Sequence, residues 1–140
     1  MIKTLAVFIL LPLALSAQDI QFPSTKDGTQ QPALFYVPPG AAATDKGPRV
    51  PLLVFLHAWS DNYLSPAGNS RTEVMDESRR RGWILIAPNF RGPNDHPGAC
   101  ASDEAVQDVI DSVNYAKRNA LVDEKRVYLL GSSGADSCRS

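Results

Sequence analysis

Blocks of apolar residues alternate with polar segments along the chain, and their lengths predict strands and helices in turn. Two short apolar segments, at 19–22 and 33–37, flank a polar turn sequence at 26–28. This arrangement predicts an antiparallel hairpin, and Pro32 favours a sheet edge because proline cannot donate to a strand ladder. Three continuous apolar runs follow, at 52–56, 83–87 and 126–130. Such runs are typical of strands that are buried on both faces.

Two amphipathic segments predict helices between these strands. The first, at 71–81, ends at Gly82, and the three arginines of its last turn complement the helix dipole and stay solvated. The second begins after Ser102, a good N-cap. Its predicted inward face consists of Ala105, Val106, Val109, Ile110, Val113 and Ala116. Strands that alternate with helices predict an α/β fold with parallel pairing and helices on both faces of the sheet.

Two acidic residues of the second helix, Asp108 and Asp111, are three positions apart and therefore lie on one face. Such a pair could form a site with two carboxylates, but charged residues of a helix usually form its solvated surface. We therefore predict that both carboxylates are solvated.

The composition excludes several classes of protein. Of the 140 residues, 44% are hydrophobic and 21% are charged, which is typical of a chain with a packed core. The formal net charge is −1, so the chain lacks the excess of cations with which proteins neutralise nucleic-acid phosphates. We expect a single globular domain and no nucleic-acid partner.

The first 17 residues have the layout of a secretory signal peptide. Lys3 is followed by an apolar run at 5–15 and by the small residues Ser16 and Ala17. The run is shorter than the roughly 20 residues that cross a bilayer, so we expect no membrane span after cleavage. Cleavage is predicted after Ala17, with Ser16 as a competing site; a buried strand or an uncleaved anchor is the alternative. A cleaved leader predicts a secreted or periplasmic protein whose domain covers 18–140.

Candidate ligands for metals and cofactors are few. Export would permit a disulfide bond between Cys100 and Cys138, although the sequence leaves open whether the two meet. His96 has no cysteine or histidine at ligand spacing, so we expect no metal ion. The glycine-containing segment at 131–136 matches neither the dinucleotide fingerprint nor the lysine-bearing phosphate loop. We expect no cofactor.

The segment after the last predicted strand carries the strongest chemical signal. Gly131-Ser132-Ser133-Gly134-Ala135 follows the strand directly, where a sharp turn into a helix would lift the Ser133 side chain out of the backbone. The pattern matches the nucleophile elbow G-x-S-x-G except at its last position. The amide of Gly134 would then point at the developing oxyanion. The alternative is a Gly/Ser loop without chemistry.

The loop after the run at 52–56 supplies a second oxyanion-hole amide in this arrangement, and we assign it to Trp59, with Ala58 as its neighbour. His57 precedes the serine, whereas the base follows it in this layout. We therefore predict that His57 holds the loop through hydrogen bonds. In the loop after 83–87, four polar residues could line a cleft but are predicted to be solvated: Arg91, Asn94, Asp95 and His96.

From about 21 to 134 the chain resembles the α/β-hydrolase fold family, and within it the prolyl oligopeptidase-like and related esterase branch. The resemblance rests on Leu-His-Ala-Trp-Ser at 56–60, Ala-Pro-Asn-Phe-Arg-Gly at 87–92, Gln-Asp-Val-Ile-Asp at 107–111 and the segment 122–134. It implies a serine hydrolase acting on a small-molecule ester or a peptide, with Ser133 as nucleophile and amides near Trp59 and Gly134 as oxyanion hole. Ala58 departs from the glycine common at its position, a change that still permits the turn.

The catalytic set is incomplete in this chain. A serine needs a base, the base needs an acid, and in this family both follow the serine. Residues 135–140 contain no histidine, and Asp136 is too close to the serine to act as the acid. The polar tail also differs from the apolar helix expected after an elbow. Restoring one base after the codon of Gly134 could encode a glycine followed by an apolar helix, so we expect a frameshift that leaves residues 135–140 out of frame.

Three functional hypotheses remain. The first is an exported serine hydrolase, represented here by its N-terminal half and inactive as given. The second is a non-catalytic truncated fragment or pseudogene product, whose unpaired strands would expose edges and apolar faces. The third is a nucleotide-binding α/β domain, which the glycine pattern disfavours.

Overall fold

The computed structural model contains one mixed five-stranded sheet with the strand order β1-β2-β4-β3-β5. It describes residues 17–58, 61–64, 70–93, 96–99 and 102–131. In chain order the elements are β1 (Gln18–Pro23), β2 (Gln30–Tyr36), β3 (Val50–Leu56), α1 (Ser70–Arg81), β4 (Ile84–Pro88), α2 (Asp103–Asn119) and β5 (Val122–Gly131). The predicted α/β alternation is therefore confirmed.

Strand direction divides the sheet into two parts. β1 pairs with β2, and β2 with β4, in antiparallel fashion, whereas β3 pairs in parallel with both β4 and β5. The predicted hairpin is confirmed and lies at one edge of the sheet. Its turn is closed by a hydrogen bond from Ser24 N to Thr29 O of 2.8 Å, and Gly28 adopts a φ of 75° that disfavours residues with a Cβ.

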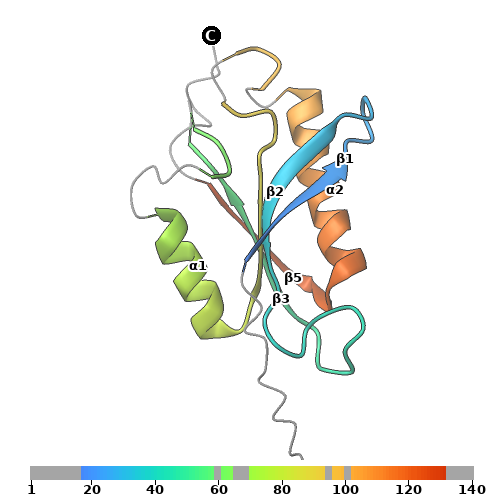
Figure 1. Cartoon of the computed structure of the whole chain (residues 1–140), viewed down its shortest axis with the longest axis vertical. Helices are drawn as coiled ribbons and strands as arrows, with labels where there is room; N and C mark the ends of the chain where they lie inside the picture. The colour runs from blue at the N-terminus through green and yellow to red at the C-terminus, as the bar shows by residue number, and fades with distance from the viewer. Residues whose placement is uncertain (1–16, 59–60, 65–69, 94–95, 100–101, 132–140) are drawn as a thin grey trace, which may run out of the picture.

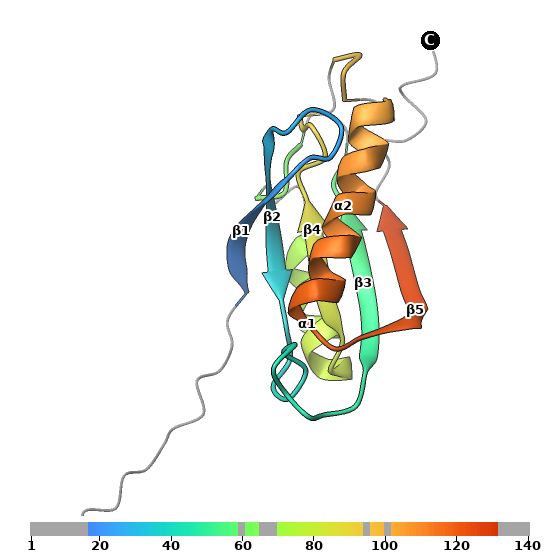
Figure 2. The same cartoon turned by 90° about the vertical axis from the view of Figure 1, so that its right-hand side faces the viewer.

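The two helices cover opposite faces of the sheet (Figures 1 and 2). On one face, Ala116 of α2 and its partly buried neighbours pack on Phe35, Val54 and Ile86. On the other face, Met75 of α1 packs on a separate set that includes Leu85. The strands are thus buried from two sides, as the continuous apolar runs predict for β3 and β4.

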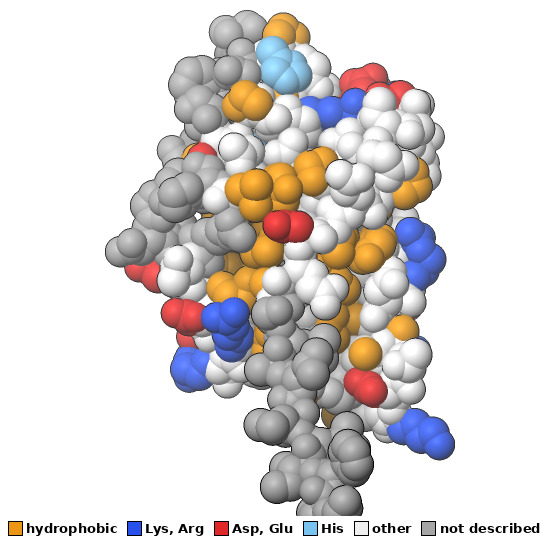
Figure 3. Space-filling view, viewed as in Figure 1, with side chains coloured by type: hydrophobic (Ala, Val, Ile, Leu, Met, Phe, Trp, Pro, Cys, Tyr) orange, Lys and Arg blue, Asp and Glu red, His pale blue; other side chains and the backbone are white. Residues whose placement is uncertain are grey.

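The predicted helix ends are confirmed. Ser102 caps α2, because its side-chain oxygen accepts a hydrogen bond of 3.1 Å from Ala105 N. α1 is followed by Gly82, whose φ is 65°, and its three C-terminal arginines are exposed and pair with Asp76 and Glu77. On the face seen in Figure 3, basic and acidic side chains are interspersed among the described residues.

The prediction of a third buried strand was wrong for β5. The strand exists and begins earlier than expected, at the buried Val122, but the apolar residues of the predicted run are exposed, and Leu129 reaches 65%. Within the described residues, β5 pairs on one side only, with β3, and Figure 2 shows it at the far edge from β1. Val127, Tyr128 and Leu130 are also exposed. An apolar run predicts a strand, but it does not show whether another strand or helix covers that strand.

The predicted inward face of α2 was also partly wrong. Ala105 and Ala116 are buried, but Val106 and Ile110 are exposed. Asp108 and Asp111 are buried instead, with Asp108 at 0% exposure. The periodicity of the sequence does not predict this face, because hydrogen-bonding partners from other parts of the chain stabilise the two buried carboxylates.

Candidate active site

The carboxyl ends of β3, β4 and β5 lie at one edge of the sheet, because these three strands are parallel. Figure 1 shows the described segments that follow β3 and β4 at the same end of the molecule, together with the β1–β2 turn. In open α/β sheets this edge carries the ligand site. The register makes the placement specific: Leu56, the last residue of β3, is the partner of Gly131, the last residue of β5.

The predicted nucleophile Ser133 and the predicted oxyanion-hole residues Trp59 and Gly134 lie outside the described residues. The structure describes the strand ends that lead to them. Paired strands lie about 4.8 Å apart. Ser133 comes two residues after Gly131, and Trp59 comes three residues after Leu56, so both segments start from neighbouring positions at this edge.

His57, the first residue after β3, is buried and has both ring nitrogens against backbone carbonyls. Nδ1 lies 2.9 Å from Ala58 O and Nε2 lies 2.9 Å from Asn89 O. A neutral imidazole donates from one nitrogen only, so either tautomer bonds within this loop pair. Both nitrogens therefore face backbone carbonyls of the two loops. The predicted structural role of His57 is confirmed.

The segment after β4 packs tightly around this imidazole. The Phe90 ring lies 4.4 Å from the His57 ring, measured between centroids. A Cβ built on Gly92 would meet His57 Cε1 at 2.6 Å and Asp61 O at 2.8 Å. Any residue other than glycine would therefore displace the ring or the backbone of the loop after β3.

Asn89 joins the loops after β3 and β4. Besides the contact of its carbonyl with His57, its side-chain oxygen accepts from Tyr63 N at 3.4 Å. Its side-chain nitrogen donates to Gly92 O at 3.2 Å. The loops at this edge are therefore one hydrogen-bonded unit rather than two independent connections.

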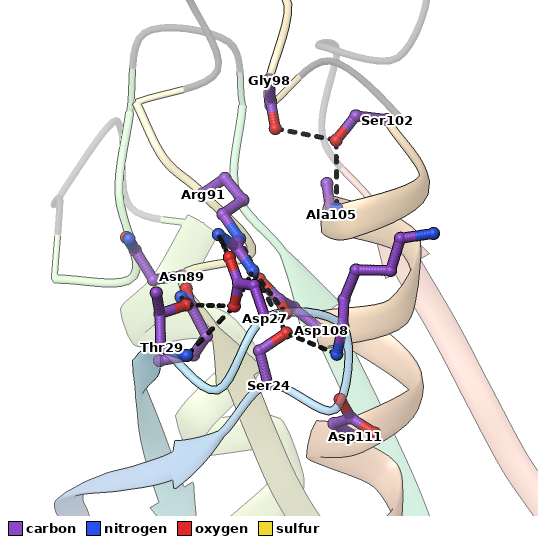
Figure 4. A network of polar contacts seen from close by, with 12 residues as sticks. Ser24, Asp27, Thr29, Asn89, Arg91, Gly98, Ser102, Ala105, Asp108 and Asp111 are labelled. Atoms are coloured by element: carbon purple, nitrogen blue, oxygen red, sulfur yellow. Dashed lines mark hydrogen bonds and ion pairs between the residues drawn. The ribbon is translucent and has the colours of Figure 1, made fainter.

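Arg91 contradicts the prediction that the loop after β4 is solvated, because its side chain is only 17% exposed. Its guanidinium binds two carboxylates from distant parts of the chain (Figure 4). Nε lies 2.5 Å from Asp108 Oδ2 in α2, and Nη1 lies 2.8 Å from Asp27 Oδ2 in the β1–β2 turn. Nη2 also donates to Ser24 Oγ at 3.1 Å. Arg91 thus ties the hairpin, the loop and α2 together.

These contacts shift the titration of the charged groups involved. The hydrogen bond from Arg91, followed by those from Thr29, holds the pKa of the Asp27 carboxyl well below its usual range. The bonds to Asp27 and Asp108 raise the pKa of Arg91 further above its usual value. The ion pair between Arg91 and Asp27 is therefore fully ionised at neutral pH.

Asp111 makes a second link between α2 and the hairpin. It accepts hydrogen bonds from Thr25 N at 2.7 Å and from Thr25 Oγ1 at 2.9 Å. Gln107 Nε2 donates to it at 3.0 Å. The prediction that Asp108 and Asp111 are solvated was therefore wrong. No local sequence pattern signals the pairing of Arg91 with Asp108, because the two residues belong to separate segments of the chain.

The other polar residues of the middle loop add little. Asn94 and Asp95 lie outside the described residues. His96 is exposed, with Nε2 at 3.2 Å from Arg91 O. Cys100 and Cys138 also lie outside the described part of the chain. No group of three or more potential metal ligands occurs among the described residues, and none of their helices is long and apolar enough to span a membrane.

Comparison with known proteins identifies the fold. No protein-family model matches the chain, and a search of curated proteins finds no significant match. Solved structures do match, among them a thermostable esterase with 23% identity and a TM-score of 0.57, covering 86% of this chain and 36% of that one. The S-formylglutathione hydrolase of Staphylococcus aureus is 13% identical with a TM-score of 0.62, covering 83% of this chain and 46% of the other.

A peptidase is also similar to this chain in structure. The acylaminoacyl peptidase of Pyrococcus horikoshii is 16% identical with a TM-score of 0.57, covering 86% of this chain and 20% of its own. These neighbours share the α/β-hydrolase fold, so the predicted fold class is confirmed. The chain spans less than half the length of each of the three structures.

Proposed function

We propose that this chain is the nucleophile-bearing half of an exported serine hydrolase that cleaves an ester or a peptide bond. The observation that carries the proposal is the pairing of Leu56 with Gly131 within an α/β-hydrolase sheet. This register brings the segment with the predicted nucleophile and the segment with the predicted oxyanion-hole amide to adjacent strand ends. Esterases and a peptidase among the structural neighbours support a small-molecule ester or a peptide as substrate.

The proposed chemistry starts with attack of Ser133 Oγ on the acyl carbonyl carbon. The serine proton passes to a base, and the carbonyl oxygen becomes an oxyanion that accepts hydrogen bonds from the amides of Trp59 and Gly134. Collapse expels the alcohol or amine and leaves an acyl-Ser133 ester, which water then hydrolyses. His57 serves as a brace for the loop after β3, since its ring nitrogens are directed at Ala58 O and Asn89 O.

The base and the acid that the family resemblance implies would come from sequence beyond Ser140. We therefore expect that the 140-residue chain does not react with a fluorophosphonate probe, which labels activated serines. Labelling of this chain that is lost in Ser133→Ala would show that the 140 residues already contain an activated serine. It would contradict the proposal that the base and the acid come from sequence beyond Ser140.

A second experiment tests the proposed activity itself. The gene is expressed with one base restored after the codon of Gly134, and its product is screened against acyl esters and proline-containing peptides. We expect fluorophosphonate labelling and hydrolysis, both abolished by Ser133→Ala. If sequencing finds the frame intact, with a stop codon after Ser140 and no related coding sequence beyond it, the proposal of a frameshift fails and the non-catalytic fragment is favoured.

Export is part of the proposal because of the layout of residues 1–17. Mass spectrometry of the protein recovered outside the cytoplasm should give a new N-terminus after Ser16 or Ala17. An exported protein that retains Met1 would contradict the signal peptide.

A further inference from the structure

Arg91 lies in a backbone conformation that needs support. Its φ is 71°, and that of the preceding residue, Phe90, is 30°. Residues with a Cβ rarely adopt positive φ, and such conformations persist only where surrounding contacts hold them. Phe90 is held by its stacking on the His57 ring, and Arg91 by the carboxylates of Asp27 and Asp108.

The backbone on either side of Arg91 reaches the loop after β3. Two residues before it, Asn89 O lies 2.9 Å from His57 Nε2. One residue after it, Gly92 lies against the His57 ring and Asp61 O with no room for a Cβ. Gly92 N also donates to Asn89 O at 2.7 Å, which closes the turn around Arg91. A displacement of this turn would therefore move His57.

We propose that Arg91 is a positioning residue: by fixing the turn at 89–92 through Asp27 and Asp108, it sets the orientation of His57 and of the loop after β3. The inference rests on the proposed function in so far as that loop carries the oxyanion-hole amide. Arg91 touches neither substrate nor the reacting atoms in this scheme. It acts through Asn89 and Gly92, and its two carboxylates make the hairpin and α2 part of the support of the site.

The geometry requires an arginine. Arg91 presents Nε and Nη2 to Asp108 and both Nη atoms to Asp27, so the planar fork spans two carboxylates at once (Figure 4). The ammonium of a lysine is a single point charge and cannot make both paired contacts. Arg91→Lys should therefore resemble Arg91→Met in its effect on the loop, although it keeps the charge.

The test follows His57 directly in the full 140-residue chain. With ¹⁵N-labelled histidine in mildly alkaline buffer, where free imidazole is neutral, we expect the ring nitrogens of His57 to resonate away from those of free histidine, because both face backbone carbonyls. A His96→Gln variant assigns the signals. In Arg91→Met and Arg91→Lys the His57 resonances should move towards those of free histidine, because the released ring loses these contacts.

Amide hydrogen exchange separates positioning from general stability. In Asp27→Asn, which leaves the buried Asp108 paired with Arg91, exchange should accelerate several-fold at Asp61 and Gly92, while Val54 and Ile86 in the core strands change by less than about twofold. Arg80→Met is the matched control, because Arg80 forms a two-bond contact with Glu77 on the exposed surface of α1 and has no bond to the loop. It should leave both readouts unchanged.

Equal acceleration at all four amides would show that Arg91 is only a general stabiliser and would overturn the proposal, as would an unchanged His57 spectrum. If Arg91→Met does not fold, Asp27→Asn weakens the contacts of Arg91 from their exposed side and should move the His57 resonances in the same direction, to a smaller degree. Neither the His57 spectrum nor the amide exchange depends on serine chemistry. Failure of the positioning proposal is therefore distinguishable from failure of the proposed function, which fluorophosphonate labelling tests.

Discussion

The Arg91 guanidinium is shared between Asp27, at the surface of the hairpin turn, and Asp108, which is fully buried in α2. A buried carboxylate is costly unless it is paired, so Asp108 makes an arginine at this position a requirement of the fold. Asp27 contributes less to stability because water reaches it. The titration of Asp27 shows whether its ion pair with Arg91 is formed.

We expect the Asp27 carboxyl to titrate well below the ordinary aspartate value of about 3.9, because Arg91 and Thr29 bond its charged form. A lowered folded-state pKa means that the contribution to stability is present above the unfolded value and is lost as pH falls through the folded value. Carboxyl ¹³C NMR measures the midpoint. Arg91→Met should raise it most of the way towards the ordinary value, with Thr29 still donating, whereas Arg80→Met should not. An equal midpoint in wild type and Arg91→Met would contradict the ion pair.

α2 is attached to the sheet by polar contacts as well as by apolar packing. Its inward face combines Ala105 and Ala116 with the two buried acids, each bonded to the hairpin turn or to the loop after β4. The helix therefore determines where the hairpin turn lies. A helix held only by apolar contacts would fix the position of this turn less closely, since hydrophobic burial is not directional.

Asp111→Ala should lower the free energy of unfolding by about 1–3 kcal/mol, because the hydrogen bonds that this buried carboxylate accepts from the Thr25 amide and hydroxyl are lost. Urea unfolding followed by circular dichroism measures the change. Asp76→Ala is the control, since Asp76 pairs with Arg79 on the exposed surface of α1, and it should change stability by less than about 1 kcal/mol. Equal effects of the two substitutions would mean that the Asp111 contacts do not stabilise the fold.

At the scale of the molecule, β5 forms an unpaired edge of the sheet within the part of the chain that the structure describes. β5 pairs with β3 on one side, and its residues Val127 to Leu130 are exposed within the described chain. Edge strands that combine free backbone groups with apolar side chains are templates for association. Charged residues, which block such pairing, are confined to the first half of the strand, at 123–126.

The 140-residue chain should therefore self-associate in a concentration-dependent manner, as sedimentation velocity can measure. Leu129→Lys should shift the distribution towards monomer, because a lysine at the exposed edge opposes strand pairing. Val106→Lys replaces another exposed apolar residue, on α2, and should have little effect. A monomeric wild type at all concentrations would contradict association through the β5 edge.

Sequence and structure agree where local chemistry decides the outcome. The Ser102 cap, the glycine after α1 and the hairpin turn around Gly28 each depend on contacts within a few residues, and all are found as predicted. The errors concern residues whose partners are distant. Asp108 and Arg91 are 17 residues apart, and Arg91 and Asp27 are 64 residues apart, so no periodicity along the chain could reveal their contacts.

By itself the sequence determined the alternation of strands and helices, the edge hairpin, the α/β-hydrolase likeness and the serine-containing segment after the last strand. The alternation and the hairpin follow from side-chain periodicity and turn chemistry, which act over short stretches of chain, whereas the likeness rests on a resemblance of sequence motifs. Only the tertiary structure decided which apolar runs are covered, which acids are buried, and that Leu56 lies beside Gly131. Those outcomes depend on the order of strands in the sheet and on charge pairing between distant segments, because burial belongs to the packed arrangement and not to any residue alone.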